Sequence, residues 1–201
     1  MPDYQLPDFE EIFQHLQSYG GRQSWFLEGQ RGEYLAQRGC GIIAASHALL
    51  YLGFTREAYA DLWPGSPLTR DHYMAYLRDL TQHLYPTYAG IFLPRQMIRG
   101  VQHFARSKGL TLNPHLYRGS WREEENFEFI HGGIRENTPV LLLTWNHHDL
   151  SFRNHWVSIT GIGLEEDKRM LIASNWGIRY RYALANWVRG FSIHRSLIYF
   201  T

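Results

Sequence analysis

Residues 39–53 read GCGIIAASHALLYLG, and this stretch decides the fold. From Cys40 to Leu52 nearly every residue is apolar or small, and no alternation of period two is present, so the stretch predicts a helix. A helix that is apolar around its whole circumference is buried on all sides. We therefore expect a central helix over residues 40–52 that ends at Gly53.

The rest of the chain predicts helices first and strands afterwards. Apolar spacing predicts amphipathic helices over residues 8–18, 70–83, 94–108 and 121–137, with a polar loop over 22–39 and a short strand over 110–117. After Pro139, β-branched and alternating residues predict strands over 140–145, 155–163, 170–174, 180–184 and 193–200. This order predicts one α+β domain over residues 1–201, with a helical part over about 1–137 and an antiparallel sheet over about 138–201.

The composition argues against several classes of function. The formal net charge is +1 and Lys and Arg form no cluster, which is unlike a nucleic-acid-binding protein. The single cysteine excludes an internal disulfide and a zinc site with several thiolates. No stretch is apolar for long enough to span a membrane, and residues 1–9 do not read as a secretory signal. We therefore expect a cytoplasmic protein without a membrane or nucleic-acid partner.

Cys40 is the candidate nucleophile. It lies between two glycines at the start of the predicted central helix, where the helix dipole lowers a thiol pKa and free N–H groups can serve an oxyanion hole. The two glycines would leave room for a substrate backbone to approach. A small buried core residue is the alternative, because free cysteines are among the most buried residues.

His155 and Asn175 are the candidate partners of this thiol. His155 begins a predicted strand after a polar loop, and its imidazole could take the thiol proton and return it to a leaving group. Asn175 follows the next strand, where its amide could accept a hydrogen bond from the imidazole Nδ1–H and hold the ring. The chain order Cys, His, Asn matches a known nucleophilic arrangement. A hydrogen-bonded surface histidine and an ordinary Asn-containing turn are the alternatives.

Three motifs together resemble the papain-like cysteine peptidase superfamily. They are GCGIIAA at residues 39–45, NHWVSITG at residues 154–161 and NWG at residues 175–177. The nearest relatives suggested are bacteriocin-processing (double-glycine leader) peptidases and papain-like proteins of Gram-positive bacteria. The resemblance covers roughly residues 30–190. It implies a cysteine-bearing helix packed on an antiparallel sheet. It also implies a peptidase without a cofactor that acts on a peptide or other acyl or amide substrate through a thioester.

Two positions depart from the papain-like pattern. The family usually carries a glutamine, an oxyanion donor, six residues before the cysteine, where this chain has Tyr34. Gln37 is therefore the candidate donor, and the Tyr34 hydroxyl is the alternative. The family asparagine lies two residues before a Trp-Gly pair, where this chain has Ser174. Either a bulge brings Asn175 to His155, or Ser174 takes the role, or the site is a Cys-His dyad.

Other roles fit parts of the pattern. Residues 147–149 (HHD) lie close to His155 in sequence, but their spacing matches no helix-borne zinc site. His47 lies about two helical turns beyond the cysteine, too far for proton transfer, and is expected to be a hydrogen-bonded core histidine. A papain-like fold with altered site residues could also be a weak or inactive binding or effector module, or an acyltransferase that passes the acyl group to an amine.

Overall fold

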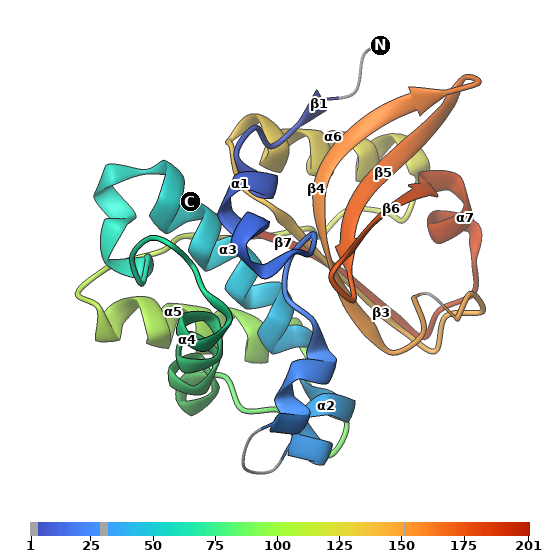
Figure 1. Ribbon diagram of the computed structural model, residues 1–201. Helices are drawn as coiled ribbons and strands as arrows, with labels where there is room; N and C mark the ends of the chain where they lie inside the picture. The colour runs from blue at the N-terminus through green and yellow to red at the C-terminus, as the bar shows by residue number, and fades with distance from the viewer. Residues whose placement is uncertain (1–3, 29–31, 151) are drawn as a thin grey trace.

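The computed structural model describes residues 4–28, 32–150 and 152–201 (Figure 1). Its helices are α1 (Phe9–Phe13), α2 (Gly32–Arg38), α3 (Cys40–Thr55), α4 (Arg70–His83), α5 (Pro94–Ser107), α6 (Glu123–Arg135) and α7 (Leu184–Arg189), with 3-10 helices at Gln14–Leu16, Gln23–Glu28 and Glu57–Leu62. Its strands are β1 (Tyr4–Gln5), β2 (Pro114–Leu116), β3 (Val140–Trp145), β4 (His155–Glu165), β5 (Lys168–Asn175), β6 (Ile178–Ala183) and β7 (His194–Phe200).

The strands form one antiparallel sheet in the order β2-β7-β3-β4-β5-β6, and β1 pairs with β4 beyond the end of β3. The α+β prediction is thus confirmed. Two of the strands, β1 and β2, come from the part of the chain before residue 138, so the helical and sheet parts are not divided cleanly along the sequence. Within the described residues, no helix combines the length and apolar character needed to cross a membrane.

The central helix α3 is buried along nearly its whole length, as its composition predicts. It does not end at Gly53 but continues to Thr55. A Cβ on Gly53 would lie 2.7 Å from the backbone nitrogen of Trp63, so this glycine allows the following 3-10 helix to pack closely against α3. Gly53 is therefore a packing glycine and not a helix terminator.

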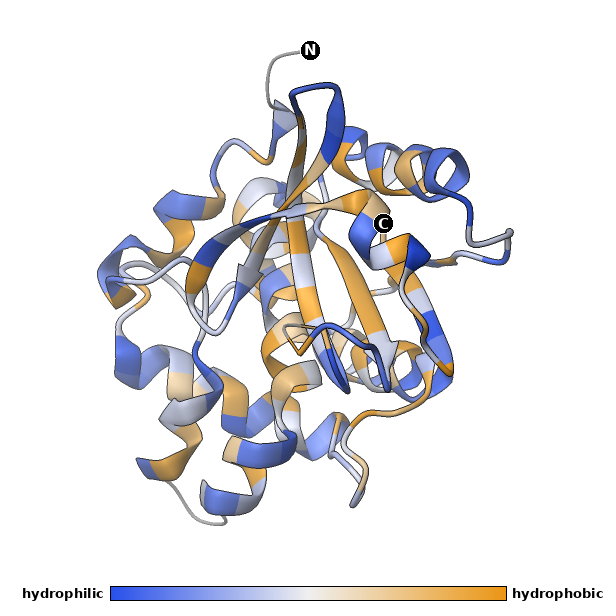
Figure 2. Cartoon of the chain, turned by 90° about the vertical axis from the view of Figure 1, so that its right-hand side faces the viewer, coloured by the Kyte–Doolittle hydropathy of each residue, from blue (hydrophilic) through white to orange (hydrophobic). Residues whose placement is uncertain are grey.

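The sheet is covered by helices on both faces. The α3 helix contacts β4 and β3, and α6 contacts β4, β7 and β3 (Figure 1). The side chain of Ser158 on β4 faces α3 and contacts His47. Val140 of β3 pairs with Ile159, the next residue of β4, and packs against Gly133 of α6. Because neighbouring residues on a strand point to opposite faces, α3 and α6 lie on opposite sides of the sheet. Figure 2 shows the resulting apolar strands at the centre and hydrophilic outer surfaces on the helices.

Most predicted elements are present, and α4, α5, α6 and the main strands agree with the prediction to within about two residues at each end. Two predicted helices differ more: the one over residues 8–18 is divided into α1 and the 3-10 helix Gln14–Leu16, and α3 ends three residues later than predicted. The predicted loop over residues 22–39 is wrong: it contains a 3-10 helix and α2, which are anchored by the buried side chains of Trp25, Phe26 and Leu35. Helix α7 was not predicted, although Leu184, Trp187 and Val188 carry helical apolar spacing and are buried.

Candidate active site

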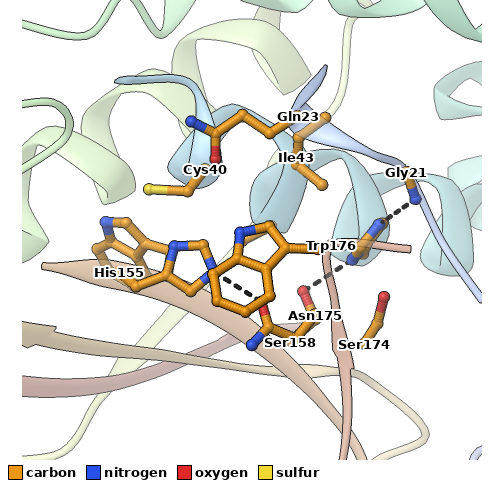
Figure 3. Close-up of a pocket in the computed structure, with 12 residues that line it drawn as sticks. Gly21, Gln23, Cys40, Ile43, His155, Ser158, Ser174, Asn175 and Trp176 are labelled. Carbon is orange, nitrogen blue, oxygen red and sulfur yellow. Dashed lines mark hydrogen bonds between the residues drawn. The ribbon is translucent and has the colours of Figure 1, made fainter. Parts of the chain in front are cut away.

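Cys40 is the first residue of α3 and lies on the wall of a small cavity between the start of that helix and the ends of β4 and β5 (Figure 3). The cavity has a volume of about 10 Å³, roughly that needed for one water molecule. His155 and Asn175 line the same cavity, so the fold brings all three predicted residues together. The cavity is completed by Gly21, Gln23, Ile43, Ala44, His47, Trp156, Ser158, Ser174 and Trp176.

The imidazole of His155 is held by Asn175. The distance between His155 Nε2 and Asn175 Oδ1 is 2.7 Å, and Asn175 Nδ2 donates to the Tyr182 hydroxyl at 3.0 Å, which fixes the orientation of the amide. Since an amide oxygen only accepts, Nε2 carries the proton and Nδ1 is the free acceptor. The bond to Asn175 therefore uses Nε2 and not the predicted Nδ1. Figure 3 shows the second ring nitrogen of His155 on the side of the cavity where the Cys40 sulfur lies.

A bulge in β4 selects Asn175 over Ser174. The pairing of β4 with β5 shifts by one residue between Ile159 and Gly161, which leaves Thr160 as the extra residue. A one-residue shift moves side chains to the other face of a sheet. Without it, Asn175 would pair with Ser158 and face α3. With it, Ser174 pairs with Ser158, and Asn175 shares the face of His155.

Ser174 has a different set of contacts. Its hydroxyl donates to the Tyr19 carbonyl oxygen, and a Cβ on Gly20 would lie 2.4 Å from that hydroxyl. Ser174 therefore fastens the segment that passes over the cavity, whereas Asn175 holds the imidazole. The geometry favours a Cys-His-Asn arrangement among the alternatives left open by the sequence.

Trp176 covers the imidazole from the solvent side. Its indole stacks on His155 with ring centroids 5.0 Å apart and an angle of 28° between the planes (Figure 3). Trp176 and Gly177 form the two-residue turn between β5 and β6 and have φ values of +51° and +74°, as a type I′ turn requires. A bulky residue at positive φ is uncommon, and the backbone conformation costs about 1–2 kcal/mol. This unfavourable backbone conformation places the indole over the imidazole of His155.

Burial keeps the thiol and the imidazole neutral. Desolvation raises the pKa of Cys40, although hydrogen bonds from the backbone N–H groups of Trp156, Gly41 and Cys40 itself, together with the charge of Arg38, act in the opposite direction. Desolvation lowers the pKa of His155 to about 4. The expectation of a lowered thiol pKa at the helix start is thus not met in this structure, because burial outweighs the helix N–H groups.

The candidate oxyanion donors lie elsewhere. Gln37 is exposed in the last turn of α2 and lines a neighbouring groove, because it is turned by roughly 200° from the buried Leu35. Tyr34 donates its hydroxyl to the Pro86 carbonyl at 3.0 Å and is not among the residues that line the cavity. Neither predicted donor is in the small cavity with the thiol.

Gln23 occupies the place that Gln37 was expected to take. Its amide lies over the cavity beside Cys40, and its Nε2 donates to the Ala36 carbonyl at 2.7 Å, which leaves a second amide hydrogen (Figure 3). Gln23 was not predicted as a site residue because it lies in the predicted loop, far before Cys40. The sharp turn at Gly20-Gly21 and the buried Trp25 were the only signals in its neighbourhood.

The glycines beside Cys40 serve packing. A Cβ on Gly41 would lie 2.8 Å from the Ile91 Cδ1 atom, and one on Gly39 would lie 2.5 Å from the Leu35 carbonyl oxygen. The space beside both glycines is therefore filled by protein and does not form the predicted approach path for a substrate backbone.

The remaining histidines of interest have structural partners. His47 is buried, its Nε2 accepts from the Gly21 N–H at 2.8 Å and its Nδ1 lies 2.9 Å from the Ser158 hydroxyl. His147 accepts from the Asp149 N–H through Nδ1 and reaches the Trp187 carbonyl oxygen through Nε2. In the described ranges, no three His, Cys, Asp or Glu side chains are placed to hold a metal ion.

Comparisons with known proteins add no relative: the chain matches no protein-family model, no curated protein and no solved structure.

Proposed function

We propose that this protein is a papain-like cysteine hydrolase, most simply a peptidase, with Cys40 as nucleophile and His155 as base. One observation carries the proposal: Asn175 holds Nε2 of His155, so Nδ1 is left as a proton acceptor in the same cavity as the thiol. A buried core cysteine would need neither an oriented imidazole nor a one-residue bulge that positions its partner.

The reaction begins with transfer of the Cys40 proton to Nδ1 of His155 as the sulfur attacks the substrate carbonyl carbon. The backbone N–H groups that face the sulfur and the second amide hydrogen of Gln23 would stabilise the oxyanion. His155 then protonates the leaving amine as the carbon–nitrogen bond breaks, and a thioester remains on Cys40. Water attacks this thioester, His155 takes its proton, and the acid leaves as the thiol is restored.

A catalytically weak or inactive module is the second candidate, and the raised pKa of Cys40 favours it. A thiol that stays protonated at neutral pH depends on proton transfer during the attack itself, so turnover depends on how closely His155 and a substrate are aligned. A lone thiol that must stay reduced also fits a reducing compartment such as the cytoplasm.

The test is to incubate the protein with an activated thioester and with a fluorogenic peptide amide library, and to measure product and covalent adduct by mass spectrometry. The proposal expects a Cys40-bound acyl group and release of acid, with both lost in Cys40→Ala. His155→Ala should lose turnover, whereas His72→Ala, a change of an exposed histidine on α4, should not. Acyl transfer to an added amine without hydrolysis would indicate an acyltransferase. Acylation that persists in Cys40→Ala would contradict the proposal.

A further inference from the structure

A larger groove adjoins Cys40 beside the small cavity. Its volume is about 240 Å³, and it shares Cys40 and Trp156 with the cavity. A cavity of about 150 Å³ is enough to accept benzene. The groove is thus large enough for an aromatic side chain placed directly next to a carbonyl group that reacts with the thiol.

One wall of the groove is apolar and held in place. It is formed by Leu143 and Trp145 of β3 and by Trp156 of β4. Trp156 donates through Nε1 to the Ile91 carbonyl at 2.7 Å, and Trp145 packs against Phe92 with ring centroids 4.6 Å apart. Both indoles are therefore fixed before any ligand arrives, which reduces the entropy cost of binding a flat apolar group against this wall.

The groove is also lined by a positively charged side chain, Arg38. Among the described residues that line the groove, Arg38 is the only one with a charged side chain, and none of the described carboxylates lies within ion-pair distance of it. Its guanidinium lies over the ring of Tyr88, 5.3 Å from the centroid. Stacking uses the face of the guanidinium and leaves N–H groups at its edge, which match the two oxygens of a carboxylate.

We propose that this groove selects the substrate, and that it binds an apolar, preferably aromatic group next to the reacting carbonyl together with a carboxylate that pairs with Arg38. This inference rests on the proposed function of Cys40 but is tested separately from it. The substrate class is thus an acidic, aromatic acyl compound, such as a peptide with neighbouring aromatic and acidic residues.

Four small alkylating reagents separate the two features without knowledge of the substrate. Iodoacetamide has neither feature, iodoacetate has the carboxylate, benzyl bromide has the ring, and 4-(bromomethyl)benzoate has both. In each case the sulfur displaces halide, a carbon–sulfur bond forms and the thiol proton is lost to base. The rate of Cys40 labelling, followed by intact mass, is divided by the rate for glutathione to remove intrinsic reactivity.

The proposal expects the reagent with both features to have the highest normalised rate, about tenfold above iodoacetamide. Arg38→Gln should lower the rates of the two carboxylate reagents about fivefold, as expected for loss of one nearby charge in a partly solvated site, and should leave the neutral pair unchanged. Ala89→Phe, which narrows the groove, should lower the two aromatic rates only. The control Arg22→Gln removes a charge from an exposed residue beside the Gly177 turn and should leave all ratios within twofold.

Equal normalised rates for the four reagents would overturn the proposal, as would an equal loss in Arg22→Gln and Arg38→Gln, which would indicate a general positive field. His155→Ala should lower all four rates alike, because it acts on the thiol and not on the groove. If His155→Ala leaves the labelling rates unchanged while the selectivity among the four reagents persists, the proposed role of His155 in catalysis is wrong but the proposed specificity of the groove stands. If no reagent labels Cys40 in the folded protein, both proposals fail.

Discussion

Acidification should unfold this protein through two buried histidines, and His47 makes the cleaner case. Its side chain is 2% exposed. Nε2 accepts a hydrogen bond from the Gly21 N–H, so Nδ1 is the donor to Ser158. Protonation of Nε2 would break the bond to Gly21 and place a charge in the core. Desolvation accordingly lowers the pKa of His47 to about 3.

The size of the effect follows from linkage between protonation and folding. An unfolded histidine has a pKa of about 6.5, so the unfolded chain takes up a proton first as the pH falls. Stability is therefore lost below about pH 6.5, down to about pH 3 for His47 and about pH 4 for His155. Between pH 7 and pH 5 each histidine should cost about 2 kcal/mol, or about 4 kcal/mol together. That is a large part of the roughly 5–15 kcal/mol by which domains are stable.

Urea unfolding at pH 7 and pH 5 measures this loss. We expect His47→Gln to be less stable than the unmodified protein at pH 7, but to lose about 2 kcal/mol less on going to pH 5. The double variant His47→Gln/His155→Gln should lose about 4 kcal/mol less, and His72→Gln should behave as the unmodified protein does. If His47→Gln shows the same difference between the two pH values as the unmodified protein, the reasoning is refuted.

Five further substitutions, in three tests, examine the geometry of the site. Asn175→Ala should lower kcat at least tenfold because the candidate base loses its tether, whereas Ser174→Ala should cost about 1 kcal/mol of stability with little loss of kcat; equal losses of kcat would contradict the bulge argument. Gln23→Ala should lower kcat about 100-fold and Gln37→Ala less than tenfold, and the reverse order would restore the sequence-based assignment. Trp176→Ala should expose the candidate base to water and raise its pKa from about 4 towards 6.5, as followed by NMR titration, and an unchanged value would mean that other groups bury it.

Local patterns predict the helices well because helical apolar spacing is repeated over several turns, as in α4 (Arg70–His83). They fail where tertiary contacts decide. Gly53 is a common helix end, yet here it lies inside α3 because the chain at Trp63 packs too closely for a side chain. Helix α2 was not predicted because its sequence is mostly polar. Its buried residues are Gly32 and Leu35, and a single large apolar side chain does not define a helical apolar face.

In the candidate site, too, local sequence patterns predict some residues and tertiary contacts decide the others. Cys40 and His155 begin elements that the sequence predicts, so both could be located in advance. The choice of Asn175 over Ser174 depends on a one-residue shift at Thr160, and no composition rule marks where a register shifts. Gln23 was beyond local reasoning, because its position depends on where the chain is carried after Gly20-Gly21.

The fastening of residues 4–23 has a consequence for the order in which the molecule assembles. Tyr19 bonds Thr160 and Ser174 across sequence separations of 141 and 155 residues, and β1 pairs with β4. Contacts between distant segments form slowly, because the intervening chain must first be ordered. During synthesis, this segment leaves the ribosome long before the strands that hold Tyr19 and β1 exist. In a nascent chain the candidate site around Cys40 is therefore not yet assembled. It would be complete only when this early segment docks onto a sheet whose other strands have already formed.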